Sequence, residues 1–204
     1  MVGVSEHYFT ENPTSHEDHG LIKCTLRGHS LEFFTSSGVF SSKKIDNGTR
    51  LLVESMEVPR VGRLLDLGCG YGVIGITASL INPALEVFMT DINSRAVALA
   101  EVNIARNEAK NTTTCKGNLY EPVEDMTFEA IITNPPMSAG MSRVVEPMIG
   151  GAHSHLNAGG SLQLVVQSKK GGRTISNLME EIFGETTILA KGSGYRVLKG
   201  VKKA

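Results

Sequence analysis

The sequence predicts an α/β fold: an open, mostly parallel seven-stranded sheet with helices on both faces. Strand-like and helix-like segments alternate from residue 63 to residue 203, which is typical of parallel strands joined by covering helices. A glycine-rich turn joins the first of these strands to the first helix. The chain ends in two strand-like segments separated only by Gly192-Ser193-Gly194, which predicts a closing antiparallel hairpin.

The core elements, within residues 61–204, follow in a regular order. The expected strands fall at 63–67, 86–91, 112–116, 129–133, 161–167, 185–191 and 195–201. The expected helices fall at 73–81, 94–107, 142–156 and 174–183. Because 41% of the 204 residues are hydrophobic, the chain has enough apolar side chains for a sizeable core in one domain.

Residues 1–60 predict an elaboration of this domain rather than a second one. Short β-like runs at 22–26 and 31–35 predict a hairpin. A helix is expected at 49–57, because Pro59 stands just beyond its end. We expect this segment to pack on one edge of the same domain.

Bulk composition excludes several classes of protein. No apolar run approaches the roughly 20 residues needed to span a bilayer, and residues 1–7 lack the basic start and apolar stretch of a secretory signal. Cys24, Cys69 and Cys115 are an odd set without CxxC spacing, which argues against a disulfide framework and a cysteine zinc site. A reducing, cytoplasmic location is expected, and nothing in the sequence indicates an oligomeric state.

Lys and Arg side chains gather toward the end of the chain, although the net charge is −1. From residue 169 onward eight of them stand against three Glu. This composition suits contact with phosphates and equally suits a solvated terminal face, so both interpretations stay open. The basic residues are Lys169, Lys170, Arg173, Lys191, Arg196, Lys199, Lys202 and Lys203.

Residues 66–72, Asp-Leu-Gly-Cys-Gly-Tyr-Gly, form the glycine-rich turn. Glycines let the backbone turn sharply and let a ligand approach without a Cβ in the way. The dinucleotide fingerprint requires a third glycine where Val73 stands. Together with the leading Asp66, this indicates a ligand with an ammonium and a sulfonium, S-adenosylmethionine, rather than one with a pyrophosphate.

Asp91 ends the second expected strand of the core. An acid at this position can accept both hydroxyls of a ribose. Asp91 can also cap the helix expected from Ser94, and the two roles are compatible.

Asn134-Pro135-Pro136-Met137 follows the fourth expected strand. A conjugated –NH₂ is a poor nucleophile, so catalysis must draw its N–H bonds toward acceptors. The Asn134 side-chain oxygen and the Pro135 carbonyl can accept them, and two prolines fix the backbone that carries these oxygens. This is positioning with electrostatic stabilisation, which requires neither a metal nor a base. Asn-Pro also occurs in ordinary turns, but its place after this strand favours catalysis.

These segments resemble the small-domain (MTS) family of class I S-adenosylmethionine-dependent methyltransferases, in particular 16S ribosomal RNA guanine-N2 methyltransferases of the RsmC type. The resemblance runs from about residue 8 to about residue 199 and includes 38–42 and 46–49. It implies a class I, Rossmann-like fold, S-adenosylmethionine as cofactor and RNA as partner. The implied reaction is methylation of an exocyclic base amine, with guanine N2 in small-subunit ribosomal RNA as the specific expectation.

The resemblance also implies site residues. Asn118 stands where the family usually has an acid at the adenine amine, and its amide oxygen can still accept. Segments 38–42 and 46–49 match a family segment that closes over the methionine end of the cofactor. The implied cofactor-binding residues are Phe40, Thr49, Asp66, Gly68, Cys69, Gly70, Gly72, Asp91, Ile92, Asn118, Leu119 and Asn134. The implied catalytic residues are Asn134, Pro135, Pro136 and Met137.

Several alternatives stay open. A protein glutamine or a small molecule could be the methyl acceptor. Met137 disfavours glutamine and adenine, because relatives that methylate glutamine typically carry Tyr at this position and those that act on adenine often carry an aromatic residue. A non-catalytic cofactor-binding module is disfavoured by the intact Asn134 and the complete glycine turn. RNA capture is expected from residues 1–60, from the basic end of the chain or from a partner, because the bacterial relatives carry two copies of this domain.

Other candidate residues are weaker. Phe33, Phe34 and Phe40 can stack on a base or lie buried under the hairpin. Arg143 can hold a phosphate or face solvent. The histidine pairs His16/His19 and His153/His155 lack the HExxH spacing, so no metal is expected.

Overall fold

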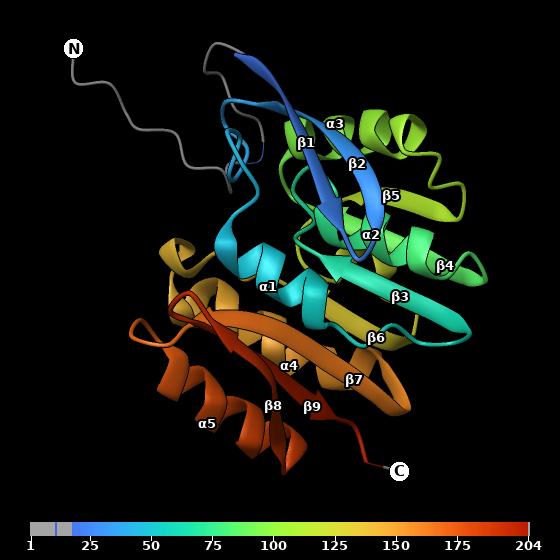
Figure 1. The fold of residues 1–204 in the computed structure, drawn as a ribbon. Coiled ribbons are helices and arrows are strands. Elements are labelled where there is room, and N and C mark those ends of the chain that lie inside the picture. Colours follow the sequence, from blue (N-terminus) through green and yellow to red (C-terminus); the bar gives the residue numbers. More distant parts are fainter. Residues whose placement is uncertain (1–10, 12–17, 204) are drawn as a thin grey trace.

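The computed structural model, which describes residue 11 and residues 18–203, confirms the predicted α/β architecture (Figure 1). The sheet contains β3 (Gly62–Leu67), β4 (Leu85–Asp91), β5 (Thr112–Lys116), β6 (Phe128–Thr133), β7 (Leu156–Gln167), β8 (Thr186–Gly192) and β9 (Tyr195–Val201). Their order is β5-β4-β3-β6-β7-β9-β8. All neighbouring strands are parallel except β9, which is antiparallel to both β7 and β8.

Helices cover both faces of the sheet. One face carries α1 (Asn47–Ser55), α2 (Val73–Ile81) and α3 (Ser94–Arg106), and the other carries α4 (Glu146–His155) and α5 (Gly172–Phe183). Successive side chains of a strand point to opposite faces. Leu64 of β3 accordingly packs in one hydrophobic cluster and Leu65 in the other, as expected for a parallel sheet buried on both sides. In the described part of the chain no helix is long and apolar enough to cross a bilayer.

The N-terminal hairpin consists of β1 (His19–Leu26) and β2 (His29–Ser36) and is longer than predicted. It lies over α2 and α3, two of the helices that cover one face of the sheet (Figure 1). Asn103 of α3 explains this placement: its Oδ1 accepts the Phe34 N–H at 2.7 Å and its Nδ2 donates to the Phe34 carbonyl at 2.9 Å. Asn107 bonds to the backbone of Glu32 in the same way, so helix side chains satisfy the free edge of β2.

The helix predicted at 142–156 is divided. A π-helical turn, η3 (Met141–Val145), precedes α4, and β7 begins at Leu156, where helix was expected. Pro147 stands in the first turn of α4, where its missing N–H costs nothing. Leu156 pairs instead with Phe128 of β6, next to a register shift in that ladder. Two further single turns are η1 (Glu121–Val123) and η2 (Met137–Ala139).

The order of the strands predicts where a ligand binds. The chain runs from β3 to β4 and β5 on one side, then returns to β6 on the other side of β3. Ligands of open α/β sheets bind at such a switch point, beyond the C-terminal ends of the strands. The glycine turn after β3, the end of β4 and the segment after β6 therefore meet there.

Candidate active site

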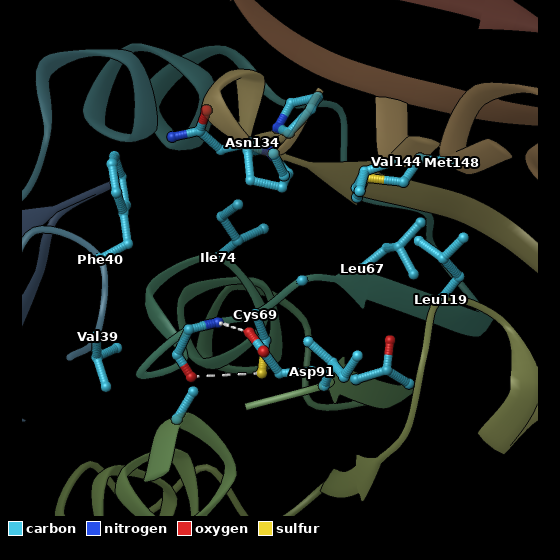
Figure 2. Close-up of a pocket in the computed structure, with 18 of the residues that line it drawn as sticks. Val39, Phe40, Leu67, Cys69, Ile74, Asp91, Leu119, Asn134, Val144 and Met148 are labelled. Atoms are coloured by element: carbon cyan, nitrogen blue, oxygen red, sulfur yellow. Dashed lines mark hydrogen bonds between the residues drawn. The ribbon is translucent and has the colours of Figure 1, made fainter. Parts of the chain in front are cut away.

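A cavity of about 510 Å³ lies at this switch point (Figure 2). Its wall combines the glycine turn, the end of β4, the turn after β5, the segment after β6 and residues 39–41 of the N-terminal segment. In Figure 2, Asn134 lies on one side of the cavity, and Cys69 and Asp91 lie on the other.

The glycine turn is held against β4 by its backbone. The N–H groups of Gly68 and Cys69 both donate to the Thr90 carbonyl, at 2.8 and 2.9 Å. Gly70 has φ +56°, and a Cβ added to it would meet no atom within 4 Å, so the space beside it is open. The turn thus leaves room for a ligand to approach the backbone, as predicted from its glycines.

Asp91 lines the cavity and is fixed by two backbone groups. Its Oδ2 accepts the Gly70 N–H and its Oδ1 accepts the Asn93 N–H, both at 2.9 Å. Burial raises the pKa of Asp91, and these backbone hydrogen bonds oppose the rise. The helix cap of α3 is Asn93, whose side chain accepts from Arg95 and Ala96, so the capping role considered for Asp91 was wrong. Each Asp91 oxygen keeps a lone pair for a further donor, such as a hydroxyl.

Asp66 and Gly72, although predicted to bind the cofactor, are not part of the cavity wall. Asp66 is fully buried beneath the glycine turn, where its Oδ2 accepts the Gly75 N–H at 2.8 Å. Its Oδ1 has no hydrogen-bond partner among the described residues. Burial raises the pKa of Asp66 to about 7, and the nearby charge of Asp91 acts in the same direction. Gly72, at φ +96°, is the N-cap of α2. Both residues shape the turn without lining the cavity.

Ile92, Asn118 and Leu119 form another part of the wall. The backbone N–H and the side-chain Nδ2 of Asn118 point to the Glu121 carboxylate, at 3.2 and 3.4 Å. The amide oxygen of Asn118 is therefore left to accept from a ligand. Sequence reasoning missed Glu121, which places an acid beside the position where the resembled family usually carries one.

Asn134 is half-buried and lines the cavity. Its Nδ2 donates to Thr49 Oγ1 at 2.9 Å and to Asp46 Oδ2 at 3.4 Å. Thr49, predicted as a cofactor contact, also lines the cavity. No described residue donates a hydrogen bond to Asn134 Oδ1. The side-chain carbonyl is thus the branch of the amide that can accept an N–H.

The two prolines shape the backbone after Asn134. The Pro135 carbonyl accepts the Met137 N–H at 2.9 Å across Pro136, whose φ of −75° and ψ of 81° form an inverse γ-turn. The Pro135 oxygen, expected as a second acceptor, therefore already holds one hydrogen bond and keeps one lone pair. Met137 is outside the cavity wall, and its Cε would lie 2.7 Å from a Cβ on Gly171. The prediction that places Met137 at the reacting group is therefore not supported, because the turn directs it toward α5.

The three phenylalanines considered for base stacking differ in their position relative to the cavity. Phe33 is fully buried, and Phe34 lies under the Arg106 guanidinium, 4.6 Å from its ring centre. Phe40 lines the cavity and is 37% exposed. Arg143, left open by the sequence, also lines the cavity and is exposed. Met148 of α4 completes the wall, and no sequence signal distinguished it from an ordinary core residue.

The metal candidates do not form a cluster. Within residue 11 and residues 18–203, no three His, Cys, Asp or Glu side chains come close enough to hold an ion. His155 stacks on Tyr120 with ring centres 4.3 Å apart, and His16 lies outside the described residues. Cys24, Cys69 and Cys115 are free thiols.

Known proteins resemble this chain in sequence and in structure. Residues 30–199 match the methyltransferase small domain family. The chain is 37% identical over 201 residues to the uncharacterized protein YbxB of Bacillus subtilis (strain 168), covering 98% of this chain and 100% of that protein. It is 35% identical over 170 residues to ribosomal RNA small subunit methyltransferase C of Mannheimia succiniciproducens, covering 82% of this chain and 50% of that protein.

A solved structure is also similar. It is the T. thermophilus 16S rRNA N2 methyltransferase RsmC in complex with AdoMet and guanosine, with a TM-score of 0.82 and 26% identity. The match covers 94% of this chain and 52% of that one. The chain thus spans about half the length of the ribosomal RNA methyltransferases that it matches.

Proposed function

This chain belongs to the methyltransferase small domain family, and we propose that it transfers a methyl group from S-adenosylmethionine to an exocyclic amine of an RNA base. Guanine N2 in small-subunit ribosomal RNA is the specific substrate that we favour, because the similar T. thermophilus structure is that of a 16S rRNA N2 methyltransferase with guanosine bound. The observation that carries the proposal is the orientation of Asn134, whose –NH₂ is held by Thr49 and Asp46 while its oxygen is left to accept.

The residues on the side of the cavity formed by the glycine turn, Asp91 and Asn118 fit this cofactor. When bound, S-adenosylmethionine supplies an electrophilic methyl group on a sulfonium sulfur. The open space beside Gly70 leaves room for a ligand next to the backbone. Asp91 would accept the ribose hydroxyls, and the Asn118 oxygen would accept the adenine amine.

Asn134 and Pro135 would act on the target amine. Asn134 Oδ1 accepts a hydrogen bond from one N–H group of the target amine, and the remaining lone pair of the Pro135 carbonyl oxygen accepts a hydrogen bond from the other. The nitrogen lone pair is thereby turned toward the methyl group. Positive charge develops on nitrogen during transfer, and preorganised oxygens stabilise it. The methylated nitrogen then loses one proton to solvent, so no side-chain base is needed.

The surface around the cavity suits an RNA. Exposed cations lie in the loop after residue 41, in the turn η3, and in the segment that follows the C-terminal end of β7 and enters α5. In the part of the chain that the structure describes, none of them forms an ion pair. They are Lys43, Lys44, Arg143, Lys169, Lys170 and Arg173.

Two lysines closer to the end of the chain are differently placed. Lys199 pairs with Glu57 at 2.6 Å, and Lys202 donates to the Leu156 carbonyl at 2.8 Å. Both lie near the end of β9, which is antiparallel to its neighbours and so ends away from the cavity. We therefore propose that Lys169, Lys170 and Arg173, rather than the final residues, contact phosphates.

We also propose that residues 1–204 form one domain and that it acts in the cytoplasm. The hairpin supports the first point, because its Leu26, Leu31 and Phe33 share a hydrophobic cluster with the sheet. The three free cysteines agree with a reducing compartment.

Mapping methylated nucleosides tests the proposal. Ribosomal RNA from a deletion strain is compared by mass spectrometry with RNA from strains complemented by the wild type or by Asn134→Ala. We expect one N2-methylguanosine to disappear on deletion and to return only with the wild type. Unchanged ribosomal RNA would overturn the RNA assignment, and binding of labelled peptide instead of labelled RNA would favour a protein amide as substrate.

A further inference from the structure

A chain of hydrogen bonds connects Asn134 to the start of α1 and to the C-terminal hairpin. Asn134 Nδ2 donates to Asp46 Oδ2 at 3.4 Å, and Tyr195 donates from its hydroxyl to Asp46 Oδ1 at 3.3 Å. Gln167 Nε2 in turn donates to the Tyr195 hydroxyl at 3.0 Å. Asp46 lies 88 positions from Asn134 and 149 from Tyr195, so three distant segments meet at one carboxylate.

The chemistry of these side chains allows only one donor-to-acceptor direction for this series of hydrogen bonds. An ionised carboxylate only accepts, so Asp46 must receive hydrogen bonds from both Tyr195 and Asn134. The Tyr195 hydroxyl has one proton and gives it to Asp46 while it accepts from Gln167. If the Asn134 amide were flipped, its oxygen would face the Asp46 carboxylate. The series of hydrogen bonds therefore fixes the –NH₂ end of the Asn134 amide toward α1.

Capping of α1 does not account for the whole arrangement. Asp46 is the N-cap of this helix, and its Oδ2 accepts the Thr49 N–H at 3.0 Å. A cap of this kind uses one carboxylate oxygen. The second oxygen is directed to Tyr195, which belongs to the C-terminal hairpin and has no part in the cap.

Packing holds the Tyr195 ring in place. A Cβ added to Gly48 would lie 2.8 Å from Tyr195 Cε1, so the ring lies directly against the backbone of the first turn of α1. Tyr195 and Gln167 are also opposite each other in the antiparallel pair of β7 and β9. The sheet thus sets the position of the hydroxyl that reaches Asp46.

We propose that Asp46 and Tyr195 are positioning residues that hold the Asn134 amide for methyl transfer. This inference rests on the proposed function. A carboxylate that accepts from the amide –NH₂ draws electron density toward the amide oxygen, which strengthens that oxygen as an acceptor. The same negative charge lies near the nitrogen on which positive charge develops. Tyr195 keeps Asp46 aligned and acts on the reaction only through it.

Two conservative substitutions test the proposal. Asp46→Asn keeps the size and a good helix cap, but its new –NH₂ can pair with the Asn134 oxygen and favour the flipped amide. We expect kcat to fall about 10- to 100-fold. Tyr195→Phe removes one hydroxyl and keeps the ring against Gly48, and we expect a fall of about 3- to 10-fold. For both variants the cofactor Kd should stay within about twofold of the wild type, as should the KM for RNA.

Tyr120→Phe is the matched control. The Tyr120 hydroxyl is buried and donates to the Met148 carbonyl at 2.6 Å, with no bond to Asp46 or Asn134. This variant loses a comparable hydrogen bond but should keep kcat. As a readout independent of turnover, the side-chain –NH₂ resonances of ¹⁵N-labelled Asn134 should shift in Asp46→Asn and Tyr195→Phe and stay in place in Tyr120→Phe.

Asn134→Ala, measured alongside, separates this inference from the proposed function. If Asn134→Ala is inactive while Asp46→Asn and Tyr195→Phe turn over like the wild type, the positioning role is wrong and the proposed function stands. If Asn134→Ala is fully active, both are wrong. A parallel loss of melting temperature, cofactor affinity and kcat in both test variants would show a structural role instead and would also overturn the inference.

Discussion

The two halves of the cavity are built in different ways. In the cofactor half, the glycine turn and Asp91 come from consecutive elements, β3, α2 and β4, and the bond between Gly70 and Asp91 joins residues 21 positions apart. Asn118, in the same half, follows β5. The substrate half is assembled around Asn134, whose partners lie 85 and 88 positions away in the chain. The contact between Gly70 and Asp91 is local in the sequence, whereas the contacts of Asn134 form only in the folded chain. Mutations in the cofactor half and in the substrate half should therefore impair cofactor binding and methyl transfer independently.

The largest expected effect is in the substrate half. Asn134→Ala removes the acceptor for the target N–H and should slow single-turnover methyl transfer by about 10²–10³. Cofactor affinity should stay within about twofold of the wild type. Asn157→Ala is the control, because this half-buried amide bonds to Glu129 at the far end of the sheet. A variant at Asn134 that transfers methyl groups at the wild-type rate would remove this residue from the mechanism.

The next effect belongs to the cofactor half. Asp91→Ala removes the proposed acceptor of the ribose hydroxyls and the partner of the Gly70 N–H, a loss of about 1–3 kcal/mol. Calorimetry should show a cofactor Kd about 5- to 150-fold weaker, with the transfer rate recovering at saturating cofactor. Asp125→Ala, at an exposed acid in the turn before β6, should leave the Kd unchanged. An equal Kd for both variants would exclude Asp91 from cofactor binding.

Asp66, buried beneath the glycine turn, gives the stability of the protein a pH dependence. Burial raises the pKa of Asp66 to about 7, above the value of 3.8 that it takes when exposed. Its contribution to stability is therefore fully present below about pH 4 and is lost as the pH rises toward 7, with a ceiling of about 4 kcal/mol.

Asp66→Asn tests this directly. The amide oxygen can still accept the Gly75 N–H, but it does not ionise. The melting temperature of the wild type minus that of the variant should fall between about pH 4 and 7 and then level off. A difference that is constant from pH 4 to 8 would show that Asp66 does not titrate in this range.

The smallest effect concerns the surface around the substrate half. Reversing the charge of Lys169, Lys170 and Arg173 together should lower the slope of log affinity for RNA against log salt by about 2–3, one phosphate contact for each cation. Cofactor affinity should not change. Lys110→Glu is the control, because Lys110 lies before β5, at the opposite end of the strands. An unchanged slope would move the RNA surface to residues 1–60.

Much of the cofactor half could be predicted because its signals are local. The glycines that permit the turn, and Asp91 at the end of a strand, stand in a fixed order along the chain. Asp66 shows the limit of such a motif. Alternation along β3 buries this side chain beneath α2, and the motif alone does not say which side of the turn is open.

The substrate half could be predicted only at Asn134 itself. Asp46 was read as part of a short motif, and nothing in the sequence linked it to Tyr195, since that bond depends on how α1 meets the C-terminal hairpin. The direction of Met137 depends on an inverse γ-turn at Pro136, which the sequence does not specify. The place of the hairpin depends on side chains of α3, far along the chain, that satisfy the backbone of β2.

The independence of the two halves is tested most directly by a double-mutant cycle with Asn134→Ala and Asp91→Ala. Cofactor Kd is measured by calorimetry and the transfer rate by single turnover at saturating cofactor, in the two single variants and the double variant. We predict that the double variant has the Kd of Asp91→Ala and the rate of Asn134→Ala, with coupling below about 0.5 kcal/mol in either quantity. A weakened Kd in Asn134→Ala, or coupling well above that limit, would contradict the division of the cavity into a cofactor half and a substrate half.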